Sequence, residues 1–110
     1  MTIDREDNLI MVSQADSELS TLLQELKDNY TSIQEANIIL VLTASGDEIR
    51  EKLAIILDAS EEHKTGNKSF VLVSETLDYD DVPEGLSIAP TVQEAKDIIE
   101  MEEIERDLGL

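Results

Sequence analysis

Residues 37–44, with the sequence NIILVLTA, form a continuous apolar run that polar residues bound. Such a run is typical of a β-strand that is buried on both of its faces. Residues 68–75, KSFVLVSE, carry a second run of the same kind. Strands that are covered on both faces occur mainly in parallel sheets with helices packed on them, so these two runs predict an α/β domain.

The segment before the first run predicts a hairpin and a helix. Residues 1–14 indicate two short strands around a turn at residues 6–8, and the second strand is the more apolar one. Residues 19–33 place leucine, tyrosine and isoleucine side chains at helical spacing, which is the pattern of an amphipathic helix. Asp16 or Ser17 is expected to cap this helix.

The later segments predict two more helices and a last strand. Residues 47–64 indicate a helix, and residues 76–85 indicate an acidic loop or a single turn. Residues 86–90 are expected to form a short strand. The final helix starts at Thr91, whose hydroxyl group can pair with the backbone of Glu94 in a capping box.

These elements predict one α/β domain over residues 1–110, in the order β-β-α-β-α-β-β-α, with residues 100–110 as a C-terminal helical extension. Strands that are separated by helices of this length are parallel neighbours joined by right-handed crossovers. We therefore expect a mixed sheet of four or five strands with helices packed on it. A thioredoxin-like topology is the alternative fold, although its redox chemistry requires cysteines, which the chain lacks.

The composition excludes several classes of partner and site. The net charge of −18, from 26 acidic and eight basic residues, would repel nucleic acids and anionic membrane surfaces. A basic protein partner, a divalent cation or solubility alone would account for this charge. The absence of cysteine excludes thiolate catalysis and zinc–thiolate sites. No apolar run is long enough to cross a bilayer and none resembles a secretion signal, so we expect a cytoplasmic protein without a cofactor.

Several segments of the chain resemble the STAS domain, the fold of anti-sigma-factor antagonists. They are the N-terminal hairpin with its helix, NIILVLTASG leading into a helix, SFVLVSE, and LSIAPTVQEAKDII. More narrowly, the ending EAKDIIEMEEIERDLGL is similar to short, uncharacterised bacterial STAS-like proteins encoded beside ribonuclease Z. The resemblance implies a non-enzymatic regulator or adaptor that binds another protein, with ribonuclease Z or a regulatory kinase as the partner.

In regulatory STAS domains a partner kinase phosphorylates a serine in an Asp-Ser-Ser-Gly-like motif after the central strand. Ser45 and Gly46 match the end of this motif, whereas Thr43 and Ala44 stand in place of its first two residues. Ser45 can also cap the next helix through the backbone of Glu48, and we favour this structural role because carboxylates in the same turn would repel a phosphate. Phosphorylation of Ser45, as in an anti-sigma-factor antagonist, is the alternative.

The single histidine and the acidic loop indicate no catalytic or metal site. His63 lies near a helix end among charged residues, so we expect it on a solvated face. Residues 78–84 are rich in carboxylates, which calcium prefers as ligands, but the EF-hand spacing requires a glycine where this loop has Pro83. We expect an ordinary solvated loop, with weak cation binding as the alternative. An enzyme or a small-ligand-binding domain is a further alternative for the chain, although the sequence indicates no pocket for a ligand.

The final helix has two apolar sides. On a helical wheel Val92, Ala95 and Ile99 share one side, which is expected to dock on the sheet. A second set of apolar residues lies almost opposite: Met101, Ile104 and Leu108.

Two carboxylates complicate the docking of this helix, because Glu102 and Glu103 fall on the side that Ala95 and Ile99 occupy one turn earlier. The burial of unpaired carboxylates costs several kcal/mol. We therefore expect the helix either to bend near Glu100 or to extend beyond the edge of the domain.

The end of the helix is accordingly predicted to bind a partner, either another protein or a second copy of the chain. The predicted contact residues lie in the last three turns of the helix: Glu100, Met101, Glu103, Ile104, Arg106 and Leu108. Leu110 is expected to join them. The alternative is that the second apolar side covers another part of the same domain, such as the first helix. No residue is predicted to be catalytic.

Overall fold

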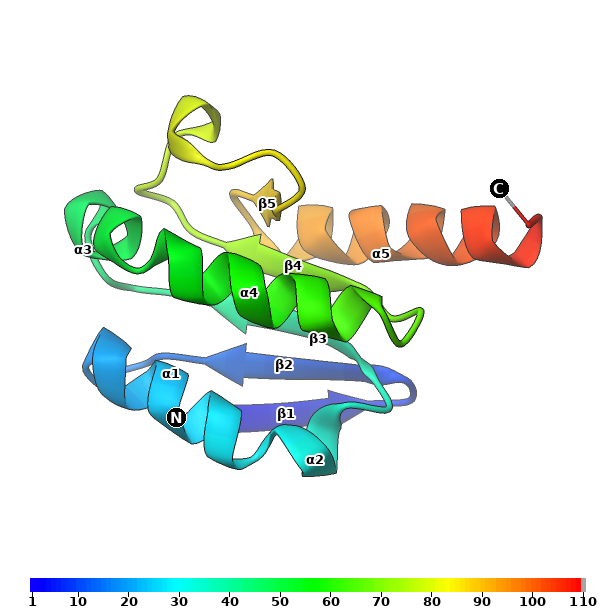
Figure 1. The fold of residues 1–110 in the computed structure, drawn as a ribbon, viewed down its shortest axis with the longest axis horizontal. Coiled ribbons are helices and arrows are strands. Elements are labelled where there is room, and N and C mark those ends of the chain that lie inside the picture. Colours follow the sequence, from blue (N-terminus) through cyan, green and yellow to red (C-terminus); the bar gives the residue numbers. More distant parts are fainter. Residues whose placement is uncertain (110) are drawn as a thin grey trace.

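Five strands form a single mixed sheet in the order β1-β2-β3-β4-β5 in the computed structural model, which describes residues 1–109 (Figure 1). β1 and β2 form an antiparallel hairpin, and each later strand lies parallel to the one before it. The predicted small α/β domain with a mixed sheet is confirmed. The strands are β1 (Thr2–Glu6), β2 (Leu9–Ser13), β3 (Asn37–Val41), β4 (Phe70–Val73) and β5 (Ser87–Ala89). The helices are α1 (Leu19–Asp28), α2 (Tyr30–Ile33), α3 (Gly46–Glu51), α4 (Leu53–Lys64) and α5 (Val92–Asp107), with a 3-10 helix η1 (Tyr79–Asp81).

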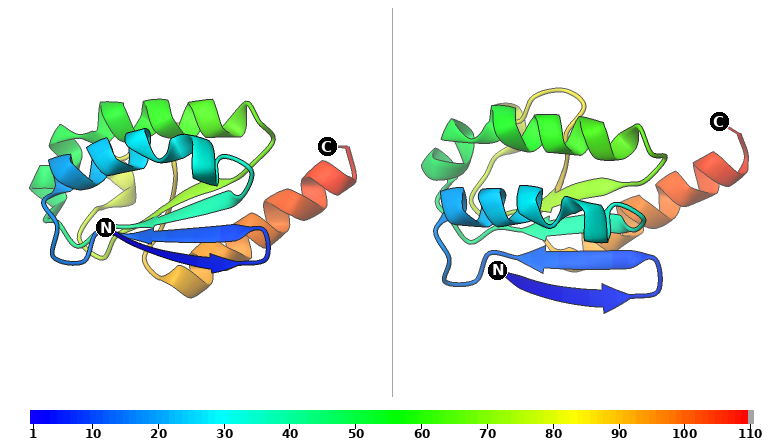
Figure 2. Two further views of the ribbon diagram at one scale, coloured as in Figure 1. Left: turned by 90° about the horizontal axis from the view of Figure 1, so that it is seen from below. Right: turned by 60° about the horizontal axis from the view of Figure 1, so that its bottom comes forward.

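Helices cover both faces of the sheet. α1 and α4 lie on one face, and α5 lies on the other (Figures 1 and 2). β3 contributes to both cores because successive side chains of a strand point to opposite faces. Ile38 and Leu40 pack beneath α1 and α4, whereas Ile39 packs against α5, and none of the three is exposed to solvent. The prediction that this apolar run is covered on both faces is confirmed.

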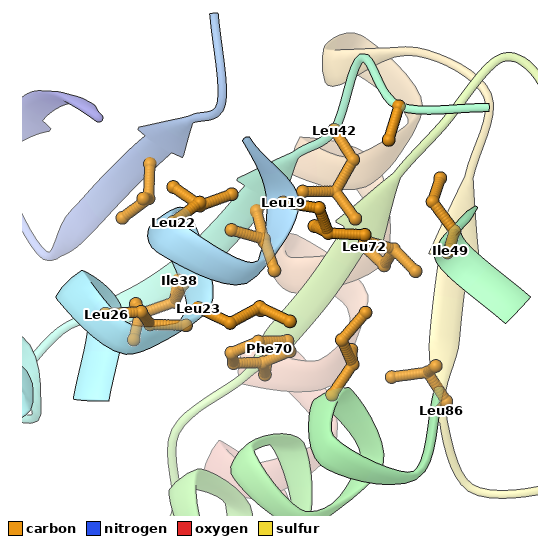
Figure 3. Packing of buried hydrophobic residues seen from close by; sticks show 14 of the residues in the cluster. Leu19, Leu22, Leu23, Leu26, Ile38, Leu42, Ile49, Phe70, Leu72 and Leu86 are labelled. Carbon is orange, nitrogen blue, oxygen red and sulfur yellow. The ribbon is translucent and has the colours of Figure 1, made fainter. Parts of the chain in front are cut away.

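The larger core lies between the sheet and the helices α1 and α4 (Figure 3). Leu19, Leu22, Leu23 and Leu26 form the buried side of α1 at helical spacing, and Phe70 of β4 belongs to the same cluster. The amphipathic pattern predicted for this segment therefore determines how α1 lies on the sheet.

Each of the two helices predicted between the parallel strands is broken in two. The first is interrupted at Asn29, whose side-chain amide donates a hydrogen bond to the Glu25 carbonyl oxygen at a distance of 2.7 Å. The Asn29 backbone N–H donates to the same carbonyl oxygen at 3.0 Å, so Asn29 caps the last turn of α1. The second is interrupted at Lys52, which separates α3 from α4.

The starts of these helices also differ from the prediction. α1 begins after Glu18 and not after Asp16 or Ser17. The Ser17 hydroxyl instead accepts a hydrogen bond from the N-terminal ammonium group at 3.0 Å. α3 begins at Gly46, where a Cβ atom would lie only 2.7 Å from the Thr76 carbonyl oxygen, so this close approach requires glycine.

Candidate interaction surface at the end of helix α5

α5 starts where the sequence predicts and returns across the sheet toward the start of the parallel strands. The Thr91 hydroxyl accepts a hydrogen bond from the Glu94 backbone N–H at 3.2 Å, which confirms the predicted cap. Ala95 and Ile99 are buried against Val71 of β4 and its neighbours in the smaller core. The first half of α5 is therefore held by apolar contacts.

The second half of α5 is held by polar contacts at the N-terminal ends of the strands. The Glu103 carboxylate accepts hydrogen bonds from the side-chain amides of Asn37, at 2.6 Å, and Asn8, at 3.1 Å. Asn37 starts β3, and Asn8 precedes β2. The Asn37 side chain also accepts a hydrogen bond from the Ser69 backbone N–H at 2.8 Å, so it joins α5 to two parallel strands.

Ser69 provides a second attachment point for the same half of the helix. Its hydroxyl donates to the Glu102 carboxylate at 2.6 Å and accepts from the Arg106 guanidinium at 3.1 Å. Glu102 and Arg106 are half-buried, whereas Ser69 is fully buried. We call the six residues of this network the α5 anchor: Asn8, Asn37, Ser69, Glu102, Glu103 and Arg106.

The α5 anchor explains why α5 does not bend near Glu100. The helix is continuous to Asp107, and its last turns extend beyond the sheet (Figures 1 and 2). The expected difficulty was the burial of unpaired carboxylates, but Glu102 and Glu103 are only half-buried and are paired with polar partners. Of the two expected outcomes, the structure has the extension and not the bend.

The side of α5 opposite the anchor carries an exposed apolar stripe. Met101 is 65% exposed, Ile104 52% and Leu108 68%. The alternative that these residues cover α1 is wrong, because α1 lies on the opposite face of the sheet (Figure 2). We refer to Met101, Ile104 and Leu108 as the apolar stripe. Leu110 lies outside the described residues.

Carboxylates surround the apolar stripe. Glu100, Glu105 and Asp107 are exposed on either side of it. The two basic residues of α5 are both engaged elsewhere in the domain, because Arg106 bonds Ser69 and Lys96 lies 3.4 Å from a Glu6 carboxylate oxygen. The stripe therefore lies in a negative electrostatic field, which attracts basic partners and repels acidic ones.

The predicted partner-binding residues fall into two groups. Glu100 and the three residues of the apolar stripe are exposed, so a partner can reach them. Glu103 and Arg106 are bonded within the α5 anchor, where they position the helix. Their predicted contact with a partner remains a prediction.

Ser45 lies at the other end of the sheet from the α5 anchor. It follows the C-terminal end of β3 and is exposed. Its hydroxyl accepts a hydrogen bond from the Glu48 backbone N–H at 3.3 Å, which confirms the predicted cap. The structure therefore does not bring Ser45 and the apolar stripe together, and phosphorylation of Ser45 remains a prediction.

His63 is buried and not on a solvated face, so this prediction is wrong. Its side chain is 1% exposed, its Nε2–H donates to the Ala36 carbonyl oxygen at 2.7 Å, and its Nδ1 accepts from the Tyr30 hydroxyl at 2.8 Å. Burial lowers the pKa of His63 below its usual value, and the nearby Lys68 charge lowers that pKa further, against the opposing effect of the Ala36 hydrogen bond. The helical spacing from Ile56 to His63 was the signal for burial, since both lie on the inner side of α4.

The acidic loop contains the predicted single turn, η1, and one of its carboxylates is paired. Asp81 accepts a hydrogen bond from Arg50 at 3.0 Å, and the same guanidinium also bonds Asp47. Within residues 1–109, no group of three or more histidine, aspartate or glutamate side chains is arranged to hold a metal ion. No helix in the described part of the chain combines the length and the apolar character needed to cross a membrane.

No protein-family model, no curated protein and no solved structure matches the chain. Three of the five large apolar side chains that are exposed within residues 1–109 belong to the apolar stripe.

Proposed function

We propose that this chain is a non-enzymatic, STAS-like regulator or adaptor of the bacterial cytoplasm that binds another protein through the apolar stripe of α5. The proposal rests on one observation. Of the five large apolar side chains that are exposed within residues 1–109, three form the apolar stripe, and the other two, Ile55 and Tyr79, lie on separate elements. A cluster of exposed apolar side chains on one side of a helix is typical of an interaction surface.

The α5 anchor strengthens this proposal because it holds the stripe in place before a partner arrives. Hydrogen bonds from Asn37 to Glu103 and from Ser69 to Glu102 attach the second half of α5 to the N-terminal ends of the strands. A preorganised surface loses little conformational entropy on binding. The complete burial of one side chain of this size contributes about 1.5–3 kcal/mol, so three such side chains can supply a useful part of the binding free energy.

The carboxylates around the stripe indicate the chemistry of the partner. Glu100, Glu105 and Asp107 are exposed beside the apolar side chains. A complementary surface presents an apolar groove with lysine or arginine residues at its rim. A second copy of the chain is the less suitable occupant, because it would bring the same carboxylates and a net charge of −18 toward the stripe.

Quantitative pull-down experiments with the full chain test the proposal. The variant Met101→Gln/Ile104→Gln/Leu108→Gln removes the apolar stripe without changing the charge, and Tyr79→Gln removes an exposed apolar side chain elsewhere. Specific partners should be lost with the triple variant and retained with Tyr79→Gln. The same partner list for the wild-type chain and the triple variant would refute the proposal.

Purified ribonuclease Z is the first defined partner to test, because the resemblance of the C-terminal segment suggests it. Calorimetric titration should detect binding to the wild-type chain that weakens as salt is added, since screening reduces attraction between opposite charges. Binding that the triple variant retains would place the contact elsewhere on the chain.

A kinase-controlled switch at Ser45 is the alternative proposal. The exposed hydroxyl is accessible, but a phosphate on it would meet the carboxylates of Asp47 and Glu48 in the first turn of α3. The mass of the chain after incubation with the candidate kinase decides this point, with Ser45→Ala as the control. An unmodified mass would exclude the switch.

A further inference from the structure

A groove separates α1 from α4 on the face of the sheet opposite α5. The two helices run in the same direction, with α1 over the β1–β2 side of the sheet and α4 over β3 and β4 (Figure 1). The groove between them has a volume of about 570 Å³. This volume lies within the range of small-molecule sites in proteins. The sequence reasoning missed the groove, because the spacing of apolar residues along a helix does not reveal how far apart two helices lie.

The floor and one wall of the groove are apolar. Leu23 and Leu26 of α1 and Phe70 of β4 line the floor and are each at most 9% exposed. Figure 3 shows Leu23 beside Phe70. Ile55 of α4 lines the wall with 53% of its surface exposed. An exposed isoleucine beside a recess of this kind provides an apolar surface that a ligand can cover.

A hydrogen bond ties the two walls together at one end of the groove. Tyr30, which follows α1, bonds His63 in the last turn of α4 at 2.8 Å. At the other end, Ser20 of α1 and Lys52 at the start of α4 line the groove. The groove therefore has two chemically different ends.

Two lysines at the groove have no partner among residues 1–109. Of the eight basic residues, all within the described part of the chain, four form hydrogen bonds or ion pairs: Arg50, Lys64, Lys96 and Arg106. Lys27 and Lys52, which both line the groove, form neither kind of contact within residues 1–109. In a chain with 26 acidic residues, two unpaired lysines at one apolar groove indicate affinity for an anion.

The acidic residues of the groove lie away from Lys52. Asp58 and Glu62 also line it, but they follow Lys52 along α4 by about 9 Å and about 15 Å, at 1.5 Å of helix per residue. Lys27 lies nearer to them, in the later part of α1. Among the residues that line the groove, the end with Lys52 and Ser20 is therefore the one that favours a negative charge.

We infer that the α1–α4 groove binds a small amphipathic anion, namely an unbranched aliphatic monocarboxylate of medium chain length. Its carboxylate lies at Lys52, and its aliphatic chain lies between the two helices and covers the exposed side chain of Ile55. This site does not depend on the function proposed for α5, because it lies on the opposite face of the sheet.

NMR titration of the full-length ¹⁵N-labelled chain with sodium decanoate, below its micelle concentration, tests this inference. The amide signals of α1 and α4 should shift in a saturable manner, while those of α5 stay unchanged. Lys52→Ala should weaken the affinity for decanoate by about threefold to fivefold, the usual effect of losing one solvent-exposed charge pair. Decylamine, with the same chain and a positive charge, should bind more weakly than decanoate.

A matched pair of alanine variants locates the site. Ala59 lines the groove, whereas Ala54 is exposed elsewhere on α4. Ala59→Leu should fill the groove and weaken the binding of decanoate by at least about tenfold, because the displaced aliphatic chain loses at least two buried methylene groups. Ala54→Leu should leave the affinity unchanged.

Ser20→Trp obstructs the groove from the exposed side of α1 and replaces Ala59→Leu if circular dichroism shows that the latter is unfolded. The inference is overturned if decanoate causes no saturable shifts of the α1 and α4 signals, or if decylamine and decanoate bind with equal affinity. It is also overturned if Ala54→Leu weakens the binding of decanoate as much as Ala59→Leu or Ser20→Trp does.

Discussion

The two halves of α5 attach to the same sheet by different means. The first half buries Ala95 and Ile99 in an apolar core, and the second half forms hydrogen bonds through Glu102 and Glu103. The polar half lies where the parallel strands begin, so that Asn37 and Ser69 can reach it. Hydrogen bonds can therefore keep a helix on the sheet beyond the last apolar residue that packs there. The opposite side of the helix is then free for a partner.

The largest effect is expected in the apolar half of α5. Ile99→Ala should lower the free energy of unfolding by about 2–4 kcal/mol, because Ile99 is buried and its truncation leaves a cavity. Ile98→Ala, at a half-buried position on the same helix, should cost clearly less. Urea denaturation of both variants measures the difference. Equal losses of stability in the two variants would show that the packing of Ile99 is not what holds the first half of α5 on the sheet.

A smaller effect is expected in the polar half. Glu103→Ala removes the acceptor of the Asn37 and Asn8 amides and should cost about 1–2 kcal/mol, because Asn37 is buried and would lack an acceptor for its amide group. Glu103→Gln keeps a side-chain oxygen that can accept these bonds and should cost less.

The matched control for Glu103→Ala is Glu100→Ala, which removes an exposed carboxylate that forms no hydrogen bond within residues 1–109. It should change the free energy of unfolding by less than about 0.5 kcal/mol, as most surface substitutions do. A loss as large as that of Glu103→Ala would mean that the α5 anchor contributes nothing specific.

The hydrogen-bonded pair of Tyr30 and His63, on the other face of the sheet, should make the stability of the chain depend on pH. Burial lowers the pKa of His63 in the folded chain, so its protonation favours the unfolded chain. The stability that neutral His63 gives the folded chain is complete above the pKa of histidine in the unfolded chain, about 6.5. This stability is lost progressively as the pH falls below that value. Urea midpoints measured from about pH 7.5 to about pH 5.5 should therefore decrease more steeply for the wild-type chain than for His63→Gln. Parallel decreases would show that His63 does not determine this pH dependence.

The smallest effect on stability is expected for the apolar stripe. Met101→Gln/Ile104→Gln/Leu108→Gln alters only side chains that are more than half exposed, so the midpoint of urea denaturation should hardly change. The same variant should lose the partner of the chain in the pull-down experiment. A large loss of stability would indicate that the stripe packs within the domain and is not free for a partner.

Much of the fold was predictable because its signals are local. The apolar runs of β3 and β4, the cap of α5 at Thr91 and the opposite placement of Met101 and Ile99 all depend on residues a few positions apart. The breaks at Asn29 and Lys52 were missed, because a helical pattern of apolar residues continues through a short interruption of the backbone.

The sequence alone determined that α5 has two apolar sides, since helical periodicity requires it. Only the tertiary structure decided that α5 stays straight, that its stripe is exposed and that His63 is buried. The partners that decide these points are remote along the chain: Glu103 bonds Asn37 and Asn8 across 66 and 95 residues, and His63 bonds Tyr30 across 33 residues. Whether a polar side chain has a partner depends on such distant contacts, which no local pattern contains.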